Sequence, residues 1–324
     1  MAFPNANYSD IIATTIQSRS RKIADNVTKN NALLTWLEKK GNIKSFSGGN
    51  VIIEELSFAE NGNGGFYSGY DLLPVAAQDV ISAAEYQIKQ AAVPVVMSGL
   101  EMLQNAGKEQ MIDLMDSRMA VAEATLANII STSLYSDGTG SGGKEITGLN
   151  AAVPVNPATG TYGGIDRSTA IGTFWRSQII DTSGLTAATL PAQMNLLWSR
   201  CVRGSDRPNL ILSDSTMWNL YVSGLQSLQR FSGTESAGYG FPTLKFMDAD
   251  IVLDGGIGGA CPVGTMFFLN TKYIKYRPHS ARNMVPLSPN KRYAVNQDAE
   301  VQIIGWAGNL TTSGARFQGR LDNN

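Results

Sequence analysis

The sequence predicts an α+β fold in which one long helix and an extended hairpin accompany a compact region of shorter helices and strands. Three observations predict it. Apolar residues recur every three or four positions across residues 109–135, which indicates a helix about 40 Å long at about 1.5 Å per residue. Two apolar, strand-like runs enclose a Gly- and Asn-rich stretch within residues 49–97, which is typical of a hairpin. Helical and buried-strand patterns then alternate through residues 186–264.

The composition is that of a chain with a sizeable core and no general affinity for nucleic acid. The 324 residues are 43% hydrophobic and 16% charged, and the formal net charge is −1. Two cysteines do not make a disulfide framework, which fits a reducing compartment. The N-terminus lacks the features of a signal peptide, and no apolar run approaches the roughly 18 residues of a bilayer span. We therefore expect a soluble chain made in the cytoplasm, with no membrane contact.

The first 48 residues predict a basic arm that ends in a helix. Residues 1–44 carry seven Lys or Arg and three Asp or Glu. Within them, "RKIADNVTKNNALLTWLEKKGN" has helical apolar spacing. Lys39 and Lys40 fall in its last turn and Gly41 follows, which is the usual way for a helix to end.

The hairpin that follows is acidic and has aromatic residues at its tip. Residues 45–88 contain six Asp or Glu and no Lys or Arg. Phe66, Tyr67 and Tyr70 lie in the turn-rich stretch between the strands. Such rings can stack on bases, but acidic surroundings oppose nucleic acid. We therefore interpret them as anchors for a protein partner.

Two helices have clear core-facing stripes. In the long helix the expected core positions are Met111, Met115, Met119, Ala122, Leu126 and Ile129. In the 186–264 region they are Met194, Leu197, Trp198 and Cys201, at i, i+3, i+4 and i+7. "RPNLILSD" predicts a buried strand there, with Ser213 or Asp214 capping the next helix. Residues 265–324 return to strand patterns.

A glycine-rich stretch, "SDGTGSGGKEITG", approaches the spacing of a phosphate-binding loop. A phosphate loop follows a buried strand and opens a helix, whose N-terminal amides face the phosphate. Here the stretch follows the long helix instead, and Glu145 stands where the metal-binding Ser or Thr belongs. The sequence therefore favours a flexible linker over a nucleotide site.

No other pattern indicates catalysis. Asp248, Asp250 and Asp254 lie close together in "DADIVLDGG" and leave open a divalent-metal enzyme, but apolar residues fill the positions that a calcium loop needs. A strand that ends in an Asp-Gly-Gly turn is the favoured interpretation. The single histidine, His279, has no metal-ligating partner at a characteristic spacing. We predict no catalytic residue, cofactor or metal site.

The order of these parts resembles the major capsid proteins of tailed bacteriophages, which have the Hong Kong 97 fold. The stretches that carry the resemblance are "NALLTWLEKKGNIKSFSGGNVIIEELSF", "FYSGYDLL", "GGIDRSTAIGTFWRSQ", "RPNLILSD", "LNTKYIKYRPHSARNM" and "NQDAEVQIIGWAGNLTTSGARFQG". Together they span nearly the whole chain.

The resemblance implies a domain plan. Residues 1–48 would be the N-terminal arm and 49–97 the extended hairpin, called the E-loop. Residues 98–185 and 265–324 would form the peripheral domain, with the helix at about 109–135 as its spine. Residues 186–264 would be the axial domain.

The resemblance also implies a structural role and a set of partners. Pentamers and hexamers of the chain would close into an icosahedral phage head around double-stranded DNA, held by weak, non-specific contact. Because the chain begins almost at the arm, we expect scaffolding and portal proteins to be separate chains, and decoration proteins stay open. Assembly would take place in the host bacterial cytoplasm, and the chain would end in the virion capsid. Some members of the family cross-link covalently through an E-loop lysine, and residues 45–88 contain no lysine for that reaction. An encapsulin-like nanocompartment shell is the alternative.

Charge complementarity gives a hypothesis for the contact between subunits. The acidic hairpin would lie across a neighbour and meet either its basic arm or its basic C-terminal strands. The residues expected at this contact are Lys39, Lys40, Glu54, Glu55, Glu60, Phe66, Tyr67, Tyr70, Arg277 and Arg282.

Overall fold

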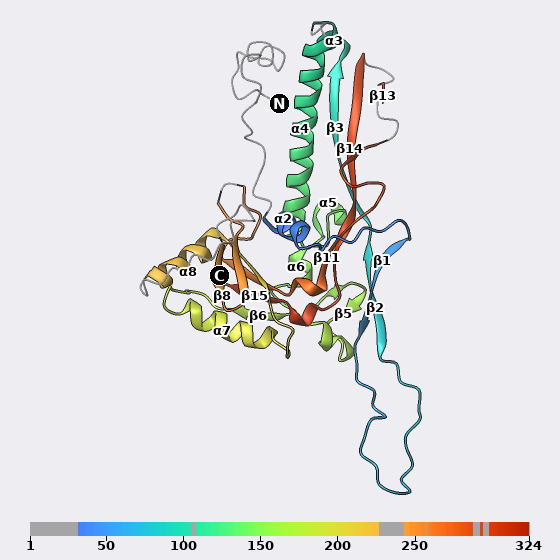
Figure 1. Cartoon of the computed structure of the whole chain (residues 1–324), viewed down its shortest axis with the longest axis vertical. Helices are drawn as coiled ribbons and strands as arrows, with labels where there is room; N and C mark the ends of the chain where they lie inside the picture. Colours follow the sequence, from blue (N-terminus) through green and yellow to red (C-terminus); the bar gives the residue numbers. More distant parts are fainter. Residues whose placement is uncertain are drawn as a thin grey trace.

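The chain forms an elongated body with a hairpin that projects from one end (Figure 1). The computed structural model describes residues 32–104, 108–226, 243–256, 258–287, 292–293 and 298–323. Helix α4 and strands β3 and β14 run along the long axis, and helices α7 and α8 lie to one side (Figure 1). Within the described residues, no helix has both the length and the apolar character that a membrane crossing requires.

The long helix α4 (Lys108–Ser133) confirms the helix predicted at about residues 109–135. It follows the short helix α3 (Gly99–Gln104). Leu126 is fully buried, as predicted. Ile129 is 42% exposed, so its predicted core position is wrong, and Ile130 is buried instead. Ile130 lies a full four residues beyond Leu126, which returns it to the same face of the helix. The predicted core positions Met111 and Met115 lie outside the residues whose side chains are described.

Strand β14 (Ala299–Thr312) organises the sheet beside α4. It pairs antiparallel with β3 (Lys89–Ser98) over ten residue pairs. On its other edge, β14 pairs with β11 (Ile274–Pro278), β12 (Val285–Pro286) and β13 (Arg292–Tyr293). The second strand of the predicted hairpin therefore divides at Ile88, because the residues before it pair with β1 and those after it pair with β14.

The hairpin itself consists of β1 (Val51–Ser57) and β2 (Ile81–Gln87) in an antiparallel pair. Helix α2 (Ala32–Lys39) precedes it. Gly41, at φ 71°, ends α2 as predicted: its N–H bonds to the carbonyl of Glu38, and the next N–H bonds to that of Leu37, which is a Schellman motif. The chain then runs parallel to β11, with Ile43 beside Tyr276. The predictions for residues 1–31 lie outside the described residues.

A six-stranded sheet in the order β6-β15-β10-β7-β9-β8 forms the second unit of the fold. Its strands are β6 (Gln178–Asp181), β7 (Leu210–Ser213), β8 (Thr243–Phe246), β9 (Ala249–Leu253), β10 (Thr265–Leu269) and β15 (Gly319–Asp322). Only β7, β8 and β9 fall inside the predicted axial range 186–264. The other three come from the ranges expected to be peripheral, because a sheet recruits strands by pairing and not by nearness in sequence.

Helices α7 (Leu190–Cys201) and α8 (Ser215–Gln226) pack on this sheet. Met194, Leu197 and Cys201 are buried, which confirms the predicted face of α7. Asp214 accepts a hydrogen bond from the N–H of Thr216 at 3.0 Å and so caps α8, as one of the two predicted alternatives has it. The remaining short elements are α5 (Gly140–Gly143), α6 (Leu149–Ala152), β4 (Thr161–Tyr162), β5 (Ile165–Asp166), η1 (Ile171–Trp175), η2 (Thr271–Tyr273) and η3 (Ala315–Phe317).

Candidate functional site

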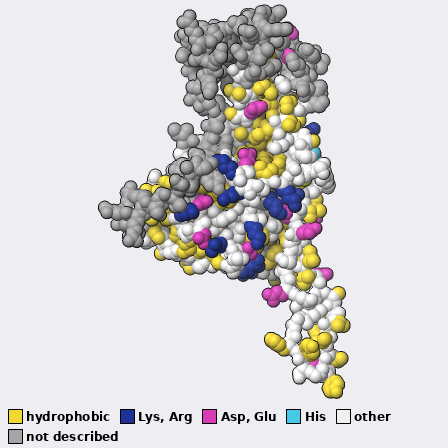
Figure 2. All heavy atoms as spheres, viewed as in Figure 1, with side chains coloured by type: hydrophobic (Ala, Val, Ile, Leu, Met, Phe, Trp, Pro, Cys, Tyr) yellow, Lys and Arg dark blue, Asp and Glu magenta, His cyan; other side chains and the backbone are white. Residues whose placement is uncertain are grey.

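The tip of the hairpin exposes an unusual amount of apolar surface. Phe66 and Tyr70 are fully exposed and Tyr67 is 68% exposed. The same loop also exposes Leu72, Leu73 and Val75, and Ile81 is exposed at the start of β2. Figure 2 shows apolar side chains on the projection that extends from the body of the molecule. Contiguous exposed apolar surface is typical of a site that binds a partner, so the tip is the first candidate contact.

The base of the hairpin is held by charges inside the chain. Along β1 the side chains alternate, and Glu54 faces inward with only 5% of its surface exposed. Its carboxylate lies 3.0 Å from Lys275 Nζ and 2.9 Å from Arg277 Nη1, both on β11. The hydroxyl of Thr311 on β14 also donates to it, at 3.0 Å. The predicted pairing of Glu54 with the C-terminal strands is therefore present, but within one chain and not between neighbours.

This corrects the role expected for Glu54 and Arg277. The Arg277 side chain is only 12% exposed, so neither residue is presented to a second subunit. Sequence reasoning could not see this, because the register that brings β1 over β11 depends on the whole sheet. Glu55, the next residue along β1, points outward and is exposed, as alternation along a strand requires.

The other predicted contact residues are spread over the surface. Lys39 and Lys40 are exposed at the end of α2, where the Lys40 ammonium lies 5.6 Å from the ring centroid of Trp36. Arg282 is exposed and donates to Gln90 at 3.2 Å. Glu60 is exposed where the tip begins. The structure of one chain leaves the inter-subunit role of these residues as a prediction.

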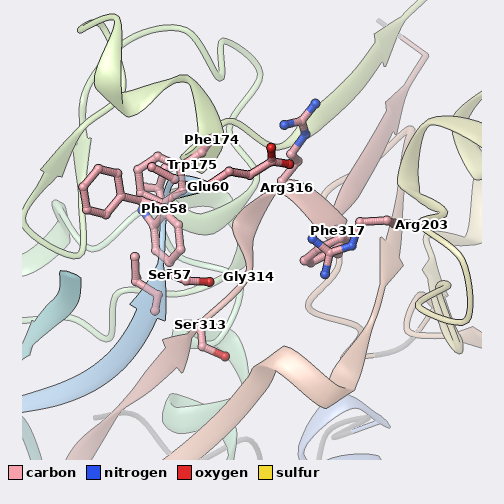
Figure 3. A pocket seen from close by; sticks show the side chains of 12 residues that line it. Ser57, Phe58, Glu60, Phe174, Trp175, Arg203, Ser313, Gly314, Arg316 and Phe317 are labelled. Carbon is pink, nitrogen blue, oxygen red and sulfur yellow. The ribbon is translucent and has the colours of Figure 1, made fainter. Parts of the chain in front are cut away.

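A half-open pocket of about 300 Å³ lies where the hairpin joins the body (Figure 3). Phe58 at the end of β1 meets Phe174 of η1 with ring centroids 5.9 Å apart. On the far side, the Arg203 guanidinium lies 4.3 Å from the ring centroid of Phe317. Glu60 extends across the pocket toward Arg316, which is exposed (Figure 3). The sequence analysis missed this pocket, because four separate segments supply its walls.

The loop that follows α4 is more ordered than the predicted linker. The Glu145 carboxylate accepts hydrogen bonds from the hydroxyls of Ser136, at 2.7 Å, and Ser141, at 3.3 Å. Lys89 Nζ donates to the carbonyl of Gly143. Positive φ at Gly142 and Gly143 lets the chain turn back on itself. The loop that connects α4 to the next element is therefore held by hydrogen bonds, where the sequence predicted a flexible linker.

The three aspartates of the alternative metal site do not form one. Asp248 is exposed and pairs with Arg207 at 2.8 Å. Asp254 is fully buried and accepts a hydrogen bond from the hydroxyl of Tyr135. Among the described residues, no cluster of three or more His, Cys, Asp or Glu could hold a metal ion. His279 packs edge-on against Phe46, with ring centroids 5.0 Å apart, in line with a packing role.

Comparisons with known proteins identify the fold. Neither a protein-family model nor a curated protein matches the chain. Solved structures do: the capsid of cyanophage A-1(L) aligns with TM-score 0.70 and 17% identity over 94% of this chain and 95% of that one. The chain has the Hong Kong 97-type capsid fold.

Two further solved capsids support the same conclusion. The capsid of a native GTA particle aligns with TM-score 0.61 and 12% identity, over 93% of both chains. The capsid of the Myoviridae phage XM1 aligns with TM-score 0.54 and 13% identity, over 96% of this chain and 98% of that one. The Hong Kong 97-type fold predicted from the sequence is therefore confirmed across nearly the whole chain. At these identities the likeness concerns the fold, and function is inferred separately.

Proposed function

We propose that this chain is a structural major capsid protein that assembles with copies of itself into a closed shell. The observation that carries the proposal is the projecting hairpin, whose apolar tip is not buried by any other part of the chain that the structure describes. Burial of one large apolar side chain contributes about 1.5–3 kcal/mol. A partner that covered Phe66, Tyr67 and Tyr70 would therefore add several kcal/mol to each contact, and a shell repeats that contact in every copy.

The fold supports the capsid over the other possibilities considered. The solved chains that share it, and whose names are given above, are capsid chains, which favours a phage head over a nanocompartment shell and over a metal-dependent enzyme. The assembly we propose is icosahedral, with pentamers and hexamers around double-stranded DNA. Scaffolding and portal proteins would be separate chains, and decoration proteins stay open. Assembly would take place in the host bacterial cytoplasm, and the product would be the virion capsid.

The contact between subunits combines an apolar anchor with charge. Glu55 and Glu60 remain exposed on the hairpin after Glu54 is assigned to its own chain. Their proposed partners on a neighbouring copy are Lys39 and Lys40 or Arg282. Each exposed pair contributes only about 0–1 kcal/mol and is screened by salt. The tip therefore supplies most of the free energy, and the charges select the register.

Electron microscopy of the overexpressed chain tests the proposal. Closed shells, tubes or polyheads are expected from the unaltered protein. The combined change Phe66→Ser, Tyr67→Ser and Tyr70→Ser should leave a folded, soluble chain that no longer assembles. The matched control is Leu196→Ser, which removes a 43% exposed apolar side chain from α7 and should not abolish assembly.

Charge reversal then tests the polar part of the contact. Glu55→Lys with Glu60→Lys should weaken assembly most at low salt. Restoration by Lys39→Glu with Lys40→Glu would identify the arm as the partner, and restoration by Arg282→Glu would identify the C-terminal strands. An unaltered chain that stays monomeric at every concentration, or tip changes that leave the shells intact, would contradict the proposed contact.

A further inference from the structure

One buried carboxyl group joins three parts of the fold that are distant in sequence. Asp254 follows strand β9 of the six-stranded sheet and is fully buried. The hydroxyl of Tyr135, just beyond the end of α4, donates to it at 2.5 Å. The backbone N–H of Leu33, in the first turn of α2, also donates to it. The sheet, the spine helix and the N-terminal helix thus meet at a single side chain.

The carboxyl group of Asp254 is tightly packed and has no positively charged partner among the described residues. The loop after β9 packs so closely that a side chain at Gly255 would lie 2.4 Å from the backbone nitrogen of Ser215, and one at Gly259 would lie 2.7 Å from the carbonyl oxygen of Asp254. The N–H of Ala260 in that loop adds a long hydrogen bond of 3.4 Å. Within the described residues, no Lys, Arg or His bonds to the carboxylate, so burial raises the pKa of Asp254, and the three donors oppose the rise only in part.

The other ionisable groups at this junction keep one charge state between pH 4 and 8. Burial raises the pKa of Tyr135 and of Cys261 well above their ordinary values, so both stay protonated. Burial also acts to raise the pKa of Asp214, but the N–H groups of Gly264 and Thr216 lower it overall, so it stays ionised.

Two further charged residues near the junction pair with each other. Arg320 on β15 binds both carboxylate oxygens of Asp322, at 2.9 and 2.7 Å. Helix α2 contributes only its backbone N–H. Among these described groups, Asp254 is therefore the carboxyl group whose proton is held more tightly in the folded chain.

We propose that Asp254 is a proton-controlled clasp: when its carboxyl group is protonated, α2 and the end of α4 are held firmly against the six-stranded sheet, and when it is ionised that junction loosens. Ionisation places a negative charge, with no cationic partner among the described residues, in a fully buried site, and the site can relieve that cost by opening. Because this inference is tested on the unassembled chain, its failure would leave the proposed capsid function untouched.

The direction of the pH effect follows from linkage. The folded chain holds the Asp254 proton more tightly than the unfolded chain does, since folding raises the pKa from its ordinary 3.8. The stabilising contribution is complete below pH 3.8 and is lost as the pH rises through the pKa of the folded state. The opening equilibrium at the junction should change by about tenfold for each pH unit within that window.

Hydrogen exchange across pH 4–8 tests the clasp on the full-length chain, at a concentration where light scattering shows monomer. After correction for intrinsic exchange rates, protection of the α2 amides and of those at the end of α4 should fall as the pH rises. Amides of α7, in the same spectra, serve as the internal reference and should show no such step. Asp254→Asn, which cannot ionise, should remove the step, whereas the exposed Asp248→Asn should retain it.

Tyr135→Phe provides a second variant if Asp254→Asn fails to fold. Loss of the hydroxyl removes a donor that favours the ionised carboxylate, so the step should move to higher pH. A step of equal size and midpoint in the unaltered chain and in Asp254→Asn would overturn the clasp. So would a step shared by α7 amides, because that would indicate global destabilisation and not a local junction.

Discussion

Removal of the charge on Glu54 is expected to destabilise the fold strongly, whereas the same change one residue later is not. Glu54→Gln keeps the shape of the side chain and an oxygen that can accept from Thr311. It removes the negative charge that lies 3.0 Å from Lys275 and 2.9 Å from Arg277. Both cations would then remain partly buried without their partner.

The magnitude follows from how well water can replace that partner. Removal of one member of a buried ion pair typically costs about 3–5 kcal/mol. Lys275 is 30% exposed and can recover part of its hydration, whereas Arg277 is 12% exposed and can recover little. Because the glutamine also keeps one hydrogen bond, we expect a loss of about 3 kcal/mol. That is a large share of a typical unfolding free energy of about 5–15 kcal/mol.

Urea unfolding followed by circular dichroism measures this loss. With a slope of about 1–3 kcal/mol/M, the midpoint should fall by at least about 1 M. Glu55→Gln, on the opposite face of β1, should change the free energy of unfolding by no more than about 0.5 kcal/mol. Glu54→Gln combined with Arg277→Met should cost less than the two single changes added together. Equal midpoints for Glu54→Gln and Glu55→Gln would refute the assignment of Glu54 to a buried pair within the chain.

Two further predictions concern the cores of the two units. Leu126→Ala should lower the free energy of unfolding in urea by about 2–5 kcal/mol because it opens a cavity beneath α4. Ile129→Ala should lower it far less because the Ile129 side chain is 42% exposed. Equal losses for the two variants would show that the buried face of α4 is misassigned. Burial raises the pKa of Cys201 to about 12, so at pH 8 the side chain is a protonated, inaccessible thiol. Ellman's reagent should react with Cys201 only after unfolding. Rapid reaction in the native chain would contradict the position of Cys201 on the buried face of α7.

The spacing of nearby residues was sufficient to predict helices α2 and α4. The features that the sequence did not predict depend on strand pairing between distant segments. The spacing of Leu126 and the end of α2 at Gly41 both depend on residues a few positions apart, and both predictions are confirmed. The stretch from Ala83 to Met97 also reads correctly as extended chain. Its change of partner at Ile88 does not appear in the sequence, because β14 lies more than 200 residues away. The sheet that crosses the predicted domain boundaries follows from the same cause.

The candidate site shows the same division. The exposed aromatic tip could be predicted, since turn residues surround Phe66, Tyr67 and Tyr70 between the two strands of the hairpin. The burial of Glu54 could not be predicted, because the sequence of an acidic strand does not show which of its glutamates lies on the buried face. The register of the strand determines that face. Alternation along β1 sends Glu54 inward and Glu55 outward, and only the folded sheet places Arg277 beneath the first of them.

The hairpin therefore consists of two parts that are stabilised by different means. Its base is fixed inside the chain, by the Glu54 ion pairs and by Tyr86, whose hydroxyl donates to the carbonyl of Thr312 at 2.7 Å. Its tip has apolar side chains that are exposed to solvent in the single chain. A base that swung freely would make the contact at the tip cost additional conformational entropy on binding. Because the base is held in place, less conformational entropy is lost there on binding, and more of the free energy of burying Phe66 and Tyr70 remains available for association.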